Sequence, residues 1–131
     1  MPERKISRML LVGDVGATKT DLAVISPGRG PGAPLAAQTF QSASFGNIEA
    51  LLKAFLKQVN LPVEAVILGV AGPVSDGRSR ITNLPWIMDE REIATSLGVS
   101  GIQGFDIFIT QGRYGVSDSL EGNLIFKVPG S

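Results

Sequence analysis

The chain has 131 residues, its 12 lysines and arginines balance 12 aspartates and glutamates, and it contains neither cysteine nor histidine. The missing residue types exclude disulfides, thiolate nucleophiles, serine–histidine triads and metal held by cysteine or histidine. The zero net charge argues against nucleic-acid binding, and the short apolar runs predict one cytoplasmic domain that does not cross a membrane.

Three strands are predicted in the first third of the chain. Residues 9–15 form an apolar run, and the second run, residues 19–26, follows so closely that a hairpin is favoured over a crossover. Residues 27–34 are rich in proline and glycine and therefore predict a loop. A partly polar third strand is expected at 35–42.

A helix and a buried strand come next. Residues 47–59 repeat apolar side chains with helical spacing, and Asn47 suits the N-cap position. Residues 63–72 are continuously apolar at their centre, which predicts a central strand buried on both faces. Residues 73–82 predict a turn or small hairpin around Asp-Gly, and the acidic start of 89–97 favours a second, short helix.

The end of the chain has weaker patterns. Gly98 is expected to stop the second helix, and residues 102–109 predict a last strand. The segment 111–131 is mixed, with a short helix or strand around 120–126. The resulting order, β-β-β-α-β-α-β, predicts a mixed five-stranded sheet with helices packed against it, an antiparallel meander first and two parallel strands last.

A cluster of small residues follows the first strand. Asp14 stands at the strand end beside Gly16 and Ala17, while Thr18 adds a hydroxyl and Lys19 a cation. A carboxylate for Mg²⁺ and backbone N–H donors for phosphate oxygens are what a metal–phosphate site needs. The spacing matches neither a Walker A loop nor a dinucleotide-binding loop. On spacing alone, a hairpin turn that simply requires small residues is the favoured alternative.

Three later positions are further candidates. Asn83 lies near the single tryptophan, Trp86, and an amide beside an aromatic ring suits sugar recognition; a packed loop with Trp86 in the core is the alternative. Asp106 lies in an apolar strand, where a carboxylate is costly unless it is used, paired or turned to solvent at a sheet edge. The glycine within 71–74 marks either a close ligand approach or a turn.

Together and in this order, these motifs resemble the N-terminal lobe of bacterial glucokinases, in the sugar kinase and actin-like ATPase superfamily. The matching stretches are LLVGDVGATKTDLAV at 10–24, ILGVAGPVSDGRSRITNLPWIMDEREIATSLGV at 67–99 and, more weakly, YGVSDSLEGNLIFKVPG at 114–130. The resemblance implies a ribonuclease H-like, actin-like α/β lobe over residues 1–131, with the second lobe absent. It also implies an ATP-dependent hexose kinase that transfers the γ-phosphoryl group of ATP to the 6-hydroxyl of glucose with Mg²⁺.

The resemblance assigns roles to individual residues. The phosphate and ATP site would comprise Asp14, Gly16, Ala17, Thr18 and Lys19. Asp14 would also face Mg²⁺, and Asn83 would lie near the sugar. Glucokinases carry an Asn-Asp pair at the end of the strand after the short helix, and that aspartate is the general base. Asp106 is the carboxylate near enough by count to take this role.

A lobe without its partner is not expected to catalyse phosphoryl transfer, because the reaction depends on positioning from both sides. The complete absence of histidine agrees with a missing second lobe, which in glucokinases supplies sugar-contacting glutamate and histidine. Two other interpretations stay open. The chain is either a non-catalytic lobe that self-associates through its exposed interlobe face, or an actin-like, ATP-binding regulatory protein.

Overall fold

The computed structural model describes residues 3–99, 106–112, 115–118 and 124–127. The elements within these residues are β1 (Glu3–Ile6), β2 (Met9–Val15), β3 (Lys19–Ile25), β4 (Ala36–Gln41), the 3₁₀ helix η1 (Ser42–Ser44), α1 (Ile48–Val59), β5 (Val63–Val70), β6 (Arg78–Arg80), β7 (Ile87–Asp89), α2 (Glu90–Val99), β8 (Asp106–Gln111), β9 (Gly115–Asp118) and β10 (Leu124–Lys127). In this part of the chain, neither α-helix is long and apolar enough to cross a membrane.

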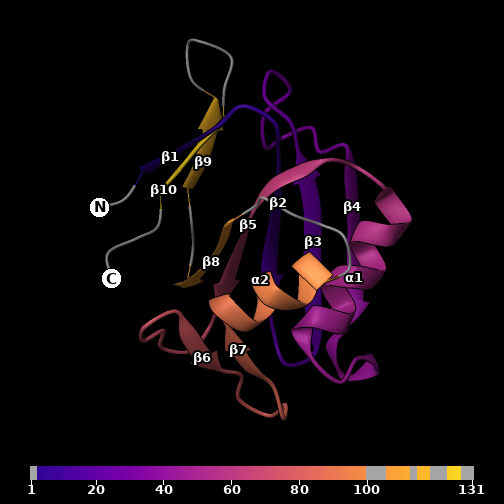
Figure 1. The fold of residues 1–131 in the computed structure, drawn as a ribbon, viewed down its shortest axis with the longest axis vertical. Coiled ribbons are helices and arrows are strands. Elements are labelled where there is room, and N and C mark those ends of the chain that lie inside the picture. The colour runs from indigo at the N-terminus through magenta and orange to yellow at the C-terminus, as the bar shows by residue number, and fades with distance from the viewer. Residues whose placement is uncertain (1–2, 100–105, 113–114, 119–123, 128–131) are drawn as a thin grey trace.

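The main sheet has five strands in the order β4-β3-β2-β5-β8 (Figure 1). Strands β2, β3 and β4 form an antiparallel meander, whereas β5 and β8 run parallel to β2. Strand β5 lies between β2 and β8, and residues 65–70 of it are buried. The predicted mixed sheet, its opening meander and its buried central strand are therefore confirmed.

Helices α1 and α2 cover one face of this sheet (Figure 1). Helix α1 begins where the sequence predicts, because the Asn47 side chain accepts a hydrogen bond from the Ala50 N–H at 2.8 Å. Asn60 ends the helix in a left-handed conformation. The apolar stripe packs onto the sheet through side chains that are fully or almost fully buried: Ile48, Leu51, Leu52, Phe55 and Leu56.

The other face of the sheet carries a smaller apolar cluster, and the second sheet packs against it. This cluster consists of Leu10, Val12, Ile25, Ala65 and Ile67, with Val116 of β9 packed on it. Strand β9 belongs to a three-stranded sheet of order β1-β10-β9. Of the short helix or strand expected around 120–126, the strand is found in part as β10, while residues 119–123 lie outside the described residues. Strand β1 was not predicted, because its sequence ERKI is mostly charged.

Two predicted boundaries are corrected by the structure. Helix α2 does not stop at Gly98 but continues to Val99, since a glycine in the last turn costs only about 1 kcal/mol and Leu97 is fully buried in the core. The last strand, expected at 102–109, is β8, which runs to Gln111. The expected positions 102–105 lie outside the described residues.

The Asp-Gly turn is confirmed and leads into a two-stranded ribbon. Ser75 and Arg78 exchange backbone hydrogen bonds of 2.9 and 3.0 Å around Asp76 and Gly77, both at positive φ. Strands β6 and β7 then pair antiparallel, and the ion pair between Arg78 and Asp89 joins them at 3.0 Å. Residues 81–86 are consequently a loop held at both ends by this ribbon.

Glu49 in the first turn of α1 is expected to make stability depend on pH. Burial raises the pKa of Glu49 above its ordinary value of 4.5, and nearby Glu92 adds to the rise. One of its carboxylate oxygens is buried and has no hydrogen-bond partner among the described residues. The stability contributed by this group is therefore complete below pH 4.5 and is lost as the pH rises through the pKa of the folded state.

Glu49→Gln removes this titration. We expect the variant to be more stable than the wild type at neutral pH by about 0.5 kcal/mol, with a flatter profile between about pH 4 and about pH 8. Urea denaturation across that range measures the effect. Parallel pH profiles for the two proteins would show that Glu49 does not titrate differently on folding.

Candidate functional site

The carboxyl ends of the three parallel strands meet at one edge of the main sheet. Val15 of β2 lies beside Val70 of β5, which in turn lies beside Gln111 of β8. The pairing continues past β8, because the Gly112 N–H donates to the Val70 carbonyl at 2.7 Å. In open α/β sheets, ligands bind beyond this edge of the strands.

A hollow of about 290 Å³ lies at this edge, and we call it the edge hollow. It is lined by Asp14, Val15, Gly16, Lys19, Asp21, Gly69, Val70, Ala71 and Gly112. The predicted phosphate cluster thus contributes a carboxylate, a glycine backbone and a cation to one cavity. Gly72, the glycine that follows β5, does not line the edge hollow, although its neighbour Ala71 does.

A second hollow of about 180 Å³, the Asn83 hollow, adjoins the first. Its lining is Val15, Gly16, Ala17, Ala71, Gly72, Ile81, Thr82 and Asn83. Val15, Gly16 and Ala71 line both cavities, so the loop of residues 16–18, the Gly16 loop, lies between them. The fold therefore brings Asn83 to the predicted phosphate cluster, although the two are far apart in the sequence.

Trp86 anchors the loop that carries Asn83 to the core. The Trp86 side chain is 1% exposed, and its indole N–H donates to the Phe45 carbonyl at 3.2 Å. The tryptophan ring therefore lies in the core, as the packed-loop alternative predicts. Asn83 itself is exposed at a φ of 69°, in the left-handed region that asparagine tolerates well. The amide of Asn83 is available to the hollow, whereas the tryptophan ring is not.

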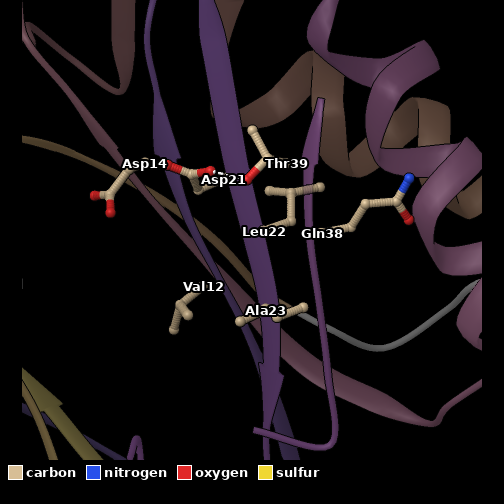
Figure 2. A pocket seen from close by; sticks show the side chains of 8 residues that line it. Val12, Asp14, Asp21, Leu22, Ala23, Gln38 and Thr39 are labelled. Atoms are coloured by element: carbon tan, nitrogen blue, oxygen red, sulfur yellow. Dashed lines mark hydrogen bonds between the residues drawn. The ribbon is translucent and has the colours of Figure 1, made fainter. Parts of the chain in front are cut away.

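Asp14 is paired across the hairpin with a second acidic residue that the sequence analysis did not identify. Asp14 on β2 and Asp21 on β3 are directly paired across the hairpin, and like charges in that position destabilise a strand pair. Figure 2 shows the Asp21 carboxylate turned toward Thr39, whose hydroxyl donates to it, while the Asp14 carboxylate points away from both. Both acids line the edge hollow, and they also line a neighbouring hollow of about 200 Å³.

These two carboxylates suit a cation better than either does alone. Their oxygens are hard ligands of the kind that Mg²⁺ prefers, and a bound cation would offset their mutual repulsion. In the described residues no group of three or more acidic side chains could hold a metal ion. Asp21 could have been identified from the predicted hairpin, because Asp14 and Asp21 lie at equal sequence distances from the centre of its turn.

The Gly16 loop leaves backbone donors free to meet an anion. The Gly16 N–H donates to the Lys19 carbonyl at 3.0 Å, which closes the loop. No acceptor is assigned, among the residues that the structure describes, to the N–H groups of Ala17 and Thr18. A side chain at Gly16 has no room, because its Cβ would lie 2.9 Å from the Lys19 carbonyl oxygen.

Asp106 lies at the other end of its strand. It pairs with Ala65 at the amino end of β8, whereas Gln111 occupies the carboxyl end beside the edge hollow. The five steps between them span about 16 Å of extended chain. The structure therefore does not bring Asp106 together with Asp14, and its role as general base gains no support from the register. Asp106 is exposed on an edge strand, as its alternative interpretation expects.

Known proteins are similar to this chain in sequence and in fold. A family model described as Glucokinase matches residues 11–112. A glucokinase of Nostoc punctiforme is 31% identical over 111 residues, which cover 83% of this chain and 32% of the relative. The chain thus spans about a third of the length of the curated relatives it matches.

Solved structures show the same fold at lower identity. Glucokinase from an Antarctic psychrotroph superposes with a TM-score of 0.62 at 18% identity, over 93% of this chain and 50% of that one. A ROK family glucokinase from Streptomyces griseus, solved in complex with glucose and AMPPNP, gives a TM-score of 0.53 at 20% identity, over 79% of this chain and 33% of that one. These superpositions confirm the predicted α/β fold class.

Proposed function

Since this chain belongs to the glucokinase family, we propose that it supplies the lobe that holds the phosphate groups and the sugar during transfer of the γ-phosphoryl group of ATP to the 6-hydroxyl of glucose. One feature carries the proposal. Two hollows flank the Gly16 loop, one with carboxylates and a lysine, the other with an asparagine amide. These two sets of groups suit the two substrates, because ATP is an anion and glucose is a neutral molecule with several hydroxyl groups.

Phosphate groups are proposed to bind at the edge hollow. Lys19 supplies positive charge within the edge hollow. The N–H groups of Ala17 and Thr18, to which no acceptor is assigned among the described residues, would supply hydrogen-bond donors from the Gly16 loop, between this hollow and the Asn83 hollow. Asp14 would hold Mg²⁺, with Asp21 across the hairpin as a second carboxylate. Bound Mg²⁺ would supply charge neutralisation for the phosphate oxygens.

The sugar is proposed to bind at the Asn83 hollow. An asparagine amide both donates and accepts hydrogen bonds, which suits hydroxyl groups that do the same. The buried Trp86 holds the loop, so Asn83 is positioned before a ligand arrives. Glucose and ATP would thus meet across the Gly16 loop.

Proton removal from the sugar lacks a carboxylate at the carboxyl end of β8, where the resemblance places the general base. Strand β8 ends at Gln111, and an amide cannot accept the hydroxyl proton at neutral pH. The chain also spans about a third of its relatives' length, and phosphoryl transfer depends on groups positioned on all sides of the phosphate. These observations favour binding without turnover by the 131 residues alone. Self-association through the exposed interlobe face stays a prediction.

Binding and turnover are separated by one set of measurements on the 131-residue chain. We expect Mg-ATP to shift the backbone amide resonances of Ala17 and Thr18, and glucose to shift the side-chain amide of Asn83, with dissociation constants near or above about 1 mM. We expect no glucose-dependent formation of ADP. Saturable glucose phosphorylation would contradict the proposed lack of turnover. Sub-millimolar affinity for Mg-ATP without glucose binding would favour an ATP-binding regulatory protein.

A matched pair of variants identifies the sugar contact. Asn83→Gly keeps the left-handed backbone and removes the amide, so it should abolish the glucose response and preserve the Mg-ATP response. Asn60→Gly makes the same change at a similar φ, 50°, at the end of α1 and away from both hollows. An equal loss of glucose binding in the two variants would remove Asn83 from the site.

A further inference from the structure

Two buried hydroxyl groups lie directly behind the Gly16 loop. Thr20 of β3 and Ser42 at the start of η1 are both 0% exposed, and their side-chain oxygens lie 2.8 Å apart. The Ser42 hydroxyl also donates to the Gly16 carbonyl at 2.7 Å. A hydroxyl has one hydrogen, and Ser42 uses it on Gly16, so Thr20 must be the donor to Ser42. The hydrogen bonds therefore run in one direction, from Thr20 through Ser42 to Gly16.

Holding the Gly16 carbonyl also sets the direction of the next N–H group. The peptide between Gly16 and Ala17 is planar and trans, so its N–H points opposite to its C=O. The carbonyl points toward buried Ser42, and the Ala17 N–H therefore points away from it. Ala17 lines the Asn83 hollow and directly follows Gly16, which lines both hollows, so its N–H lies on the loop across which the phosphate groups and the sugar are proposed to meet. No acceptor for this N–H is assigned in the described part of the chain.

Ser42 holds the far end of the same loop as well. Its backbone N–H donates to the Thr18 carbonyl at 3.0 Å. One residue thus binds two carbonyls of the loop, at Gly16 and at Thr18, from the buried side. With both carbonyls held, the loop has little freedom to turn its peptides, and its N–H donors need no reorganisation when an anion arrives.

We propose that Ser42, supported by Thr20, is the positioning residue of the Gly16 loop and orients the Ala17 N–H for a phosphate oxygen. Ser42 is fully buried, out of reach of a ligand on the surface, so it acts through the peptide that it holds. The phosphate as ligand rests on the proposed function, whereas the orientation of the peptide rests on the hydrogen bonds alone.

Ser42→Ala and Thr20→Val separate positioning from structural support. Both variants remove a buried hydroxyl, and both should lose stability for that reason. Only Ser42→Ala removes the bond to the Gly16 carbonyl, because Thr20→Val leaves Ser42 free to keep it. The probe is inorganic pyrophosphate, followed through the backbone amide resonances of Ala17 and Thr18. We expect about tenfold weaker binding in Ser42→Ala and a change within about twofold in Thr20→Val.

The ligand-free chain gives a second, independent measurement. Amide hydrogen exchange and ¹⁵N relaxation at Ala17 should report a more mobile loop in Ser42→Ala and an unchanged loop in Thr20→Val. If Ser42→Ala fails to fold, Ser42→Cys keeps a weak donor in the same place and should give an intermediate loss of affinity.

The outcomes distinguish this inference from the proposed function. Equal pyrophosphate affinity and equal Ala17 mobility in wild type and Ser42→Ala would overturn the role of Ser42. Equal losses in Ser42→Ala and Thr20→Val would overturn it too, in favour of structural support alone. No pyrophosphate binding by the wild type would overturn the proposed function, while a loop mobilised only in Ser42→Ala would still support Ser42 as its positioning residue.

Discussion

Replacing Gly16 by alanine is expected to weaken phosphate binding by at least about tenfold while the chain stays folded. The new Cβ would lie 2.9 Å from the Lys19 carbonyl oxygen, closer than such atoms approach. That oxygen is part of the backbone and accepts the Gly16 N–H at 3.0 Å, so it cannot turn aside as a flexible side chain would. The loop must open, and its N–H donors then lose their direction.

Gly46→Ala is the matched control for this variant. A Cβ at Gly46 would have no heavy atom within 4 Å, and Gly46 is not among the glycines at positive φ. It should therefore bind pyrophosphate as the wild type does. Titration with pyrophosphate, followed through the backbone amide resonances of Ala17 and Thr18, measures the affinity in each protein. Unchanged binding in Gly16→Ala would mean that the Gly16 loop is not the phosphate site.

Replacing Trp86 by alanine is expected to give the largest loss of stability, about 3–5 kcal/mol. Trp86 is the largest fully buried side chain, and it joins the core formed by the helices and the main sheet. Truncation would leave a cavity in that core and remove the hydrogen bond to Phe45. Since domains of this size are stable by about 5–15 kcal/mol, much of the population would unfold on mild heating.

Trp86→Phe separates the two contributions of the ring. Phenylalanine fills most of the space but cannot donate to the Phe45 carbonyl, so we expect a loss of about 1–2 kcal/mol. Urea denaturation followed by circular dichroism measures both variants, because the wild-type fluorophore is absent. A loss below about 2 kcal/mol in Trp86→Ala would show that the loop repacks around the gap.

The main sheet and its two helices were predictable because their signals are local. The apolar run of β2, the buried run of β5 and the helical stripe after Asn47 each specify their element within a dozen residues. Strand β1 was missed for the opposite reason. Its four residues, ERKI, carry no apolar alternation, and the strand exists only because β10 pairs with it from the far end of the chain.

The residues of the proposed phosphate cluster could be grouped from the sequence because they adjoin one another along the chain. Asp14, Gly16 and Lys19 reach one hollow through a single hairpin. Thr20 and Ser42 were not predictable, since their proposed role depends on a contact between β3 and the start of η1. An isolated serine or threonine gives no sign in the sequence that it will be buried behind a functional loop.

The sequence by itself determined the main sheet, its two helices, the glucokinase family and the residues of the proposed phosphate loop, because these depend on local spacing and short motifs. Only the tertiary structure decided which residues share an edge of the sheet. Asn83 lines one hollow together with the Gly16 loop. Asp106, in contrast, lies at the amino end of β8, and Gln111 lies at its carboxyl end. The reason is physical: a residue's place along a strand follows from its hydrogen-bonded register with β5, and each residue of shift moves a side chain by about 3.3 Å and to the other face.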